Sequence, residues 1–325
     1  METPSIVILD GYTINPGDNP WSPVEALGNC TIYDRTPPEL KIERARDADI
    51  ILTSKCKLDS DVIAALPRLK YISLLATGYN NVDVVAAAQR GIPVSNVPAY
   101  STESVAQTAF ALLLELATAV GLHDAAVKAG EWVRCPDHAF WKTSILELDG
   151  LTLGIVGYGT IGRAMARIGS AFGMKVVVYA PRVPSDTGPV PVSFLSLDEL
   201  CAVSDVVSLN CPQTADNEGF VNARLLSLMK PTALLINVAR GGLVNEADLA
   251  DALRTGTIAG AGLDVVAHEP MRADNPLLGA PNCIFTPHIA WASLAARRRL
   301  MGIVAANVSA FLAGQPINVV NAMAG

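Results

Sequence analysis

Three glycines in the middle of the chain have the spacing of a dinucleotide-binding loop. The pattern Gly157-x-Gly159-x-x-Gly162 follows an apolar, strand-like run and leads into a helix-compatible stretch. The first glycine permits a tight turn, the second lets the backbone approach a pyrophosphate, and the third allows the helix to pack closely on the strand. Glycines also serve simple turns, but this context predicts a cofactor site that includes Thr160 and Ile161.

The segment after the next strand bears on the choice between NAD and NADP. A site that prefers NAD usually has an Asp or Glu about 20 residues after its glycines, where it binds the adenosine ribose. Here the strand-like run 175–179 leads into Ala180, and Arg182 follows. Alanine removes repulsion of a 2′-phosphate, and arginine can pair with it. We therefore expect NAD(P) with NADP weakly favoured, the alternatives being a solvated Arg182 and an Asp186 that reaches the ribose.

Three further segments accompany the glycine loop in a fixed order. They are Ile236–Gly242, Gly262–Pro270 and Thr286–Ala290. Together with the glycine loop they resemble the D-isomer-specific 2-hydroxyacid dehydrogenase family over essentially the whole chain. The resemblance is greatest to its glycerate dehydrogenase and hydroxypyruvate reductase branch, at Ala76–Asp83, Phe140–Trp141 and His288–Trp291.

The resemblance implies reduction of a 2-oxo acid, which needs a cation for the carboxylate and a proton donor for the carbonyl oxygen. Arg240 offers a planar guanidinium, and His288 lies in the segment that matches the family's catalytic histidine. Glu269 matches the carboxylate that orients this histidine and would favour the imidazolium form. Taken alone, each of these residues would more often be solvated or structural.

Four more residues receive roles from the same resemblance. Asp264 matches an aspartate on the nicotinamide side of the cofactor, although by itself it could be a local turn cap. The backbone amides of Ala76, Thr77 and Gly78, after another apolar strand, are expected to hold the substrate carboxylate opposite Arg240. The alternative for Gly78 is a role in the turn alone.

Strand and helix patterns alternate along the chain and predict two α/β units. Strand-like runs in the first unit lie at 5–10, 49–53, 70–76 and 92–97, with helical patterns at 38–48, 59–66 and 82–90. Residues 101–116 read as a capped connecting helix, and 130–150 as a loop. The second unit has strand candidates at 152–157, 175–179, 205–209, 233–238, 259–263 and 283–286, separated by helical patterns at 161–172, 196–202, 222–229 and 246–254.

We therefore expect an α/β protein with two Rossmann-like, doubly wound parallel-sheet domains and an active-site cleft between them. Residues 1–100 are assigned to a substrate-binding domain. A helix near 291–313 is expected to fold back on it, so that residues 289–325 complete this domain. Residues 101–288 are assigned to the dinucleotide-binding domain.

Composition excludes several other classes of function. Among 325 residues, 50% are hydrophobic and the net charge is −7, which argues against nucleic acid or an anionic membrane as a partner. The N-terminus lacks the features of a signal peptide, so we expect a cytoplasmic protein. No ligand cluster is evident for a metal, and buried, reduced thiols are expected at the six scattered cysteines, Cys30, Cys56, Cys135, Cys201, Cys211 and Cys283.

The family resemblance therefore implies an NAD(P)-dependent D-2-hydroxyacid dehydrogenase that reduces hydroxypyruvate or glyoxylate to D-glycerate or glycolate. The alternatives are a dinucleotide-binding transcriptional corepressor of the same fold and another dehydrogenase of the family, such as phosphoglycerate dehydrogenase. Formate dehydrogenases of the family have glutamine where Glu269 stands. The sequence leaves open the physiological substrate, the direction of the reaction and the cofactor ratio.

A homodimer is the expected assembly. The family commonly dimerises through the side of its cofactor domain, and residues 101–141 are expected to contribute. Trp132, Phe140 and Trp141 supply large contact surfaces there. The alternative is that these aromatic side chains pack within their own chain.

Overall fold

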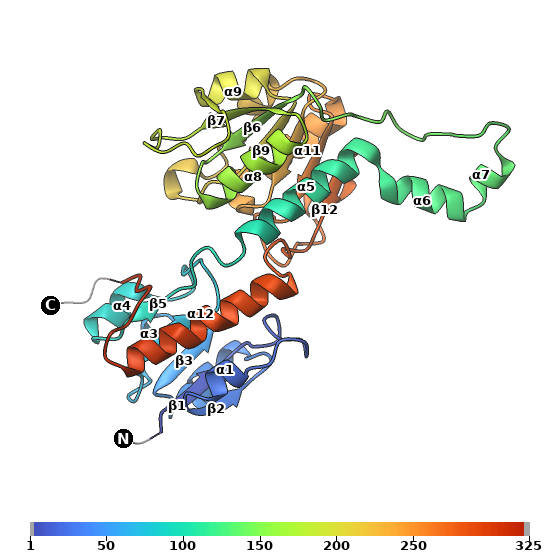
Figure 1. Cartoon of the computed structure of the whole chain (residues 1–325). Helices are drawn as coiled ribbons and strands as arrows, with labels where there is room; N and C mark the ends of the chain where they lie inside the picture. Colours follow the sequence, from blue (N-terminus) through green and yellow to red (C-terminus); the bar gives the residue numbers. More distant parts are fainter. Residues whose placement is uncertain (1–2, 322–325) are drawn as a thin grey trace. The chain divides into compact units, whose positions relative to one another are not determined.

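Two parallel β-sheets organise the chain in the computed structural model, which describes residues 3–321 (Figure 1). Each sheet belongs to its own unit, the first formed by Met1–Ser101 with Ala292–Gly325 and the second by Thr102–Trp291. The boundaries expected from the sequence, at 100/101 and 288/289, lie within three residues of these. Which unit binds substrate and which binds cofactor remains a prediction.

The first unit contains a five-stranded sheet in the order β2-β1-β3-β4-β5, and every neighbouring pair is parallel. Its strands are β1 (Ser5–Ile8), β2 (Asn29–Ile32), β3 (Ile50–Thr53), β4 (Tyr71–Leu74) and β5 (Val94–Ser95). One face packs on α2 (Lys41–Ala45), α3 (Ser60–Ala64) and α4 (Val84–Gln89), and α12 (Leu294–Leu312) packs on β4 and on α1 (Ser22–Glu25). The C-terminal helix thus completes this unit.

The second unit contains a seven-stranded parallel sheet in the order β12-β11-β10-β9-β6-β7-β8. Its strands are β6 (Thr152–Val156), β7 (Lys175–Tyr179), β8 (Ser193–Phe194), β9 (Val206–Leu209), β10 (Leu234–Asn237), β11 (Gly260–Leu263) and β12 (Cys283–Phe285). The strand order reverses between β6 and β9, which is where doubly wound sheets bind ligands. The predicted class, two doubly wound parallel sheets, is confirmed.

Helices cover both faces of the second sheet and form a separate apolar core on each. One core includes α5 (Thr102–Thr118) and α8 (Thr160–Ala171), and the other includes α9 (Leu197–Val203), α10 (Ala223–Leu228) and α11 (Glu246–Thr255). The buried apolar strands explain why the sequence predicted this sheet well, because strands covered on both faces read as continuous hydrophobic runs.

Some elements depart from the sequence-based prediction. The edge strands β2 and β8 were not predicted, because their exposed or half-buried residues form no continuous apolar run. The prediction of a loop over 130–150 is wrong at α7 (Glu131–Arg134), which is a short helix. The prediction that the cysteines are buried holds only for Cys201, since the other five free thiols are partly exposed.

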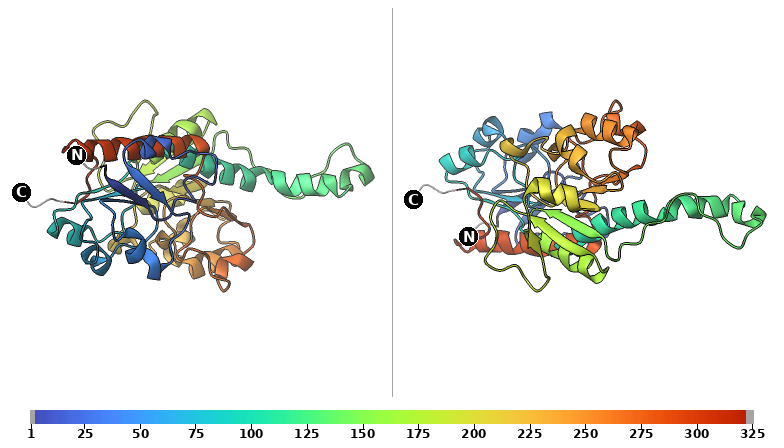
Figure 2. Two further views of the ribbon diagram at one scale, coloured as in Figure 1. Left: turned by 90° about the horizontal axis from the view of Figure 1, so that it is seen from below. Right: turned by 90° about the horizontal axis from the view of Figure 1, so that it is seen from above.

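A helical arm leaves the second unit after α5. The chain turns at Ala119, which has a φ of 47°, and continues as α6 (Val120–Lys128) and then α7. Figure 2 shows α6 and α7 projecting from the sheet of their own unit. Trp132 and Trp141 in this arm are 51% and 71% exposed, so much of each indole surface is left uncovered by its own chain, although Trp132 Nε1 donates to the His138 carbonyl oxygen at 3.0 Å.

Across residues 3–321 no single helix is both long and apolar enough to cross a membrane, and only the bent pair α5 and α6 together meets the length and composition required.

Asp49 ties together three segments of the first unit. Its carboxylate accepts a hydrogen bond from the Ser5 amide at 3.0 Å and pairs with Lys70 at 2.9 Å and Arg68 at 3.2 Å. Burial opposes ionisation of Asp49, but the Ser5 and Lys70 hydrogen bonds and the charges of Lys70 and Arg68 outweigh it and hold the pKa of Asp49 below its ordinary value. The ionised form therefore stabilises the folded unit.

We expect Asp49→Asn to lower the free energy of unfolding at pH 7 by about 1 kcal/mol. A pKa that is lower in the folded state contributes stability above the unfolded value, about 3.9, and this stability is lost as the pH falls through the folded value. The difference between wild type and variant in urea unfolding should therefore shrink from pH 7 to pH 3. The exposed Asp47→Asn is the control, and an equal difference at both pH values would contradict the role of Asp49.

Candidate active site

The glycine loop connects β6 to α8, and its geometry explains each glycine. Gly157 has a φ of 97°, and a Cβ there would lie 2.8 Å from the backbone of Asn210. A Cβ on Gly162 would lie 2.2 Å from the Gly157 carbonyl oxygen. By contrast, a Cβ on Gly159 would meet nothing within 4 Å. Gly157 and Gly162 are thus needed for packing, whereas Gly159 leaves open surface at the start of α8.

This open surface fits the pyrophosphate of a dinucleotide. The first turn of α8 has no side-chain cap, so its backbone N–H groups remain for an anion. Thr160 is exposed there and Ile161 is partly buried. At the neighbouring end of β9, Asn210 has a buried Oδ1 with no hydrogen-bond partner among the described residues. Sequence analysis did not identify Asn210, because only the strand order, in which β9 lies next to β6, brings it close to the glycine loop.

The loop between β7 and β8 carries the residues expected to choose between NAD and NADP. Ala180 directly follows β7 and is partly buried, and Arg182 is exposed with no ion pair among residues 3–321. The Asp186 carboxylate accepts a hydrogen bond from the Gly188 amide at 2.8 Å. Asp186 therefore already closes a turn of its own loop.

Three adjacent strand ends bring the other candidate residues into one region of the second unit. Arg240 follows β10, is exposed, and donates from Nη1 to the Ala239 carbonyl oxygen at 2.7 Å. The Asn237 side chain donates to the Arg240 carbonyl oxygen at 2.9 Å. A Cβ on Gly241 would lie 1.8 Å from the backbone of Val266, so the turn after β10 lies directly against the turn after β11.

Asp264 fixes the segment that follows β12. Its Oδ1 accepts hydrogen bonds from Thr286 Oγ1 at 2.6 Å and the Ile289 amide at 2.9 Å, and its Oδ2 accepts one from the Ala290 amide at 3.0 Å. The side chain is 2% exposed. The carboxylate thus serves as the anchor of its neighbouring turn, and its expected role on the nicotinamide side of the cofactor remains a prediction.

His288 and Glu269 form a close pair. The His288 Nδ1 lies 2.6 Å from Glu269 Oε2, and the two side chains are 27% and 34% exposed. His288 has a φ of 55°, and its amide donates to the Asp264 carbonyl oxygen at 2.8 Å. With Nδ1 held by Glu269, Nε2 is the ring nitrogen left to meet a substrate. The pairing expected from the sequence is present in the structure, and its catalytic role is a proposal.

The predicted substrate loop lies in the first unit. Ala76, Thr77 and Gly78 follow β4, and Thr77 is held through its hydroxyl, which donates to the Val97 carbonyl oxygen at 2.7 Å. The Val97 amide in turn donates to the Ala76 carbonyl oxygen at 3.0 Å. Each unit therefore carries part of the expected set, and the joint action of the two parts is a proposal.

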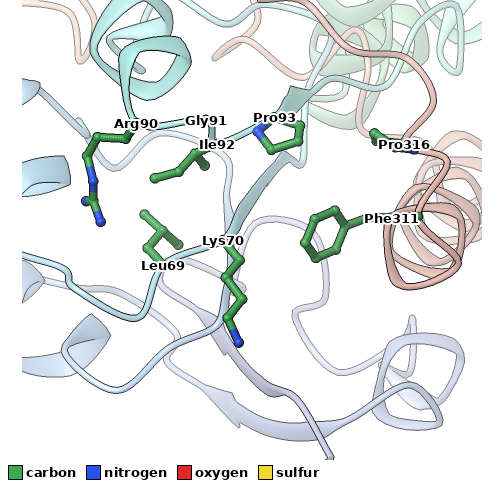
Figure 3. Close-up of a pocket in the computed structure, with 9 residues that line it drawn as sticks. Leu69, Lys70, Arg90, Gly91, Ile92, Pro93, Phe311 and Pro316 are labelled. Carbon is green, nitrogen blue, oxygen red and sulfur yellow. The ribbon is translucent and has the colours of Figure 1, made fainter. Parts of the chain in front are cut away.

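A shallow pocket elsewhere in the first unit is a weaker candidate. Figure 3 shows that Lys70, Arg90, Ile92, Pro93 and Phe311 line it. Its two cations are already engaged, because Lys70 pairs with Asp49 and Arg90 donates to the carbonyl oxygens of Ile63 and Leu66. Within residues 3–321, no group of three or more His, Cys, Asp or Glu side chains could hold a metal ion.

Known proteins resemble this chain over nearly its full length. Residues 110–290 match the family described as "D-isomer specific 2-hydroxyacid dehydrogenase, NAD binding domain". The chain is 48% identical to a hydroxypyruvate reductase of Blautia hydrogenotrophica over 319 residues, which are 97% of this chain and 99% of that protein. It is 40% identical to a glycerate dehydrogenase of Methylorubrum extorquens over 293 residues, 89% of this chain and 91% of the relative.

A solved structure is also similar to this chain over nearly its full length. The NADPH-dependent glyoxylate/hydroxypyruvate reductase of Sinorhizobium meliloti, in complex with NADP and malonate, matches with a TM-score of 0.84 and 33% identity. The match covers 98% of this chain and 97% of that one. The similarity therefore extends over both sheets.

We expect Asp264→Asn to destabilise the protein by about 1–3 kcal/mol, because an amide nitrogen would face donors that now bind a carboxylate oxygen. Urea unfolding measures this loss. Asparagine keeps only one of the two oxygens, so hydrogen exchange of the Ile289 or the Ala290 amide should also become faster, depending on which of them loses its acceptor. The exposed Asp274→Asn is the control, and unchanged exchange of both amides in Asp264→Asn would contradict the anchoring role.

Proposed function

Because this chain belongs to the D-isomer-specific 2-hydroxyacid dehydrogenase family, we propose that it reduces hydroxypyruvate or glyoxylate, giving D-glycerate or glycolate. It is an oxidoreductase that acts on a CH–OH group and uses a nicotinamide dinucleotide. The observation that carries the proposed chemistry is the His288–Glu269 pair. The proposal includes a cytoplasmic location, in keeping with six free cysteines.

The proposed reaction transfers a hydride and a proton to the substrate. When bound, the reduced nicotinamide supplies the hydride that attacks the carbonyl carbon of the substrate. His288 donates a proton from Nε2 to the carbonyl oxygen, so that the carbonyl becomes an alcohol. Glu269 holds the His288 Nδ1 at 2.6 Å and stabilises the imidazolium before it gives up this proton. The pair therefore orients the proton donor.

Arg240 is the proposed cation for the substrate carboxylate. One of its N–H groups is used by the Ala239 carbonyl oxygen, and the exposed guanidinium keeps further donors for an anion. In the first unit, the backbone at Ala76, Thr77 and Gly78 is the proposed second site for the carboxylate. A planar guanidinium also polarises the carbonyl group, which favours attack by hydride.

We expect His288→Asn to lower kcat for hydroxypyruvate reduction by about 100-fold or more, because general acid catalysis typically contributes that much. The dissociation constant for NADPH should stay unchanged. Nicotinamide absorbance measures turnover, and fluorescence titration measures binding. The control is His268→Asn, a second histidine of the same region, which should retain activity. Full turnover by His288→Asn would remove His288 from the mechanism, and a wild type inactive on every small 2-oxo acid would favour the corepressor alternative.

NADPH is the proposed preferred cofactor, because Ala180 leaves room for a 2′-phosphate and Arg182 can pair with it. Arg182→Ala should raise KM for NADPH about tenfold, because the loss of one charged hydrogen bond weakens binding by about that factor. The KM for NADH should change little. Ala180→Asp should shift preference toward NADH. The exposed Arg46→Ala is the control. A wild type that strongly prefers NADH, with no response to Arg182→Ala, would contradict this assignment.

A homodimer built on the helical arm is also part of the proposal. Several apolar side chains of the arm are exposed, among them Trp132, Val133 and Trp141, and such surfaces are typical of protein interfaces. Light scattering should give about twice the 34.2 kDa of one chain. Val133→Asp, at a side chain 88% exposed, should yield a folded monomer, whereas the control Val85→Asp, at one 63% exposed, should not. A wild-type monomer with full activity would contradict the dimer.

A further inference from the structure

Tyr158 links the glycine loop to the cofactor-selecting loop. It stands between Gly157 and Gly159, and it is only 8% exposed. Its hydroxyl donates to the Thr187 carbonyl oxygen at 2.9 Å. The ring packs edge-on against Phe194, with centroids 5.8 Å apart. Burial raises the pKa of the Tyr158 hydroxyl, so it stays protonated and can donate at neutral pH.

Arg163, on the first turns of α8, holds the same part of this loop. Its guanidinium lies over the Tyr158 ring, 4.8 Å from the centroid, and donates to the Asp186 carbonyl oxygen. A Cβ on Gly188 would lie 3.2 Å from Arg163 Nη1, so the guanidinium also lies close to the turn. Arg163 and Tyr158 thus bind two consecutive carbonyl groups of the loop, those of Asp186 and Thr187.

These two contacts are what fixes the loop between β7 and β8. Within the part of the chain that the structure describes, hydrogen bonds from outside the loop to residues 181–189 come only from Tyr158 and Arg163. Ala180, Val190 and Val192 pack against the core and hold the ends of the loop. Arg182 lies between the packed end at Ala180 and the turn held by Tyr158 and Arg163.

We propose that Tyr158 and Arg163 are positioning residues that set the distance between the pyrophosphate turn and Arg182, and so set discrimination between NADPH and NADH. The inference rests on the proposed function of Arg182. Tyr158 belongs to the turn that receives the pyrophosphate, so its bond to Thr187 fixes the loop relative to that anion. NADH lacks the 2′-phosphate and gains little from this fixed spacing.

The test is Tyr158→Phe, which keeps the ring packed on Phe194 and under Arg163 but removes the bond to Thr187. Dissociation constants for NADPH and NADH are measured by fluorescence titration. The expected result is a threefold to tenfold weaker NADPH complex, the size of one hydrogen bond, with NADH affinity changed by less than about twofold. Arg163→Met should act in the same direction. Tyr179→Phe, a tyrosine at the end of β7 whose hydroxyl has no hydrogen bond among the described residues, is the control and should change neither constant.

A double-variant cycle separates positioning from general loosening of the fold. In an Arg182→Ala background, Tyr158→Phe should cause no further loss of NADPH affinity, because the group that it positions is absent. Equal weakening of NADPH and NADH by Tyr158→Phe, or no change in either, would overturn the inference. Thermal unfolding confirms that each variant is folded.

Failure of the proposed cofactor preference gives a different pattern. Arg182→Ala would then leave NADPH affinity unchanged, and the inference, which rests on Arg182, would be overturned together with that preference. If Arg182→Ala weakens NADPH binding but Tyr158→Phe causes no selective loss, the cofactor preference stands and only the positioning role is overturned.

Discussion

The buried carboxylate of Asp264 is the interaction on which the candidate site depends. It sits at the end of β11 and accepts hydrogen bonds from Thr286, Ile289 and Ala290, all on the neighbouring segment. Those bonds define the turn in which His288 adopts a φ of 55°. A non-glycine residue in this region needs its surroundings to hold it there. The imidazole therefore reaches Glu269 because a carboxylate on the adjacent strand fixes the backbone beneath it.

Sequence patterns predicted the parts of the molecule that carry local signals. The glycine loop and the strand before it were predicted because Gly157, Gly159 and Gly162 have a required spacing next to an apolar run. The pairing of Glu269 with His288, 19 residues apart, was expected from a family resemblance and is present. The arm helix α7 was not predicted, because a four-residue helix carries too few positions for a period to show.

Other features depend on which strands lie side by side. Asp264 was expected on the nicotinamide side of the cofactor, with a local turn cap as the alternative, and the cofactor role stays a prediction. Its three bonds to the segment after β12 follow from the parallel pairing of β11 with β12. Likewise, Tyr158 reaches Thr187 across 29 residues, and a tyrosine between two glycines gives no local sign of that contact. Arg182 was singled out by its position after a strand, whereas the residues that hold its loop became visible only in three dimensions.

The exposed aromatic residues of the helical arm also determine what the protein's intrinsic fluorescence reports. The chain has four tryptophans. Trp21 is buried and Trp291 is half-buried, whereas Trp132 and Trp141 lie on the arm with 51% and 71% of their surface exposed. Half of the indole side chains thus lie in one projecting segment. Dilution that uncovers the arm alone would change the environment of these two indoles, whereas unfolding of the first unit would also expose Trp21, which is 7% exposed in the fold.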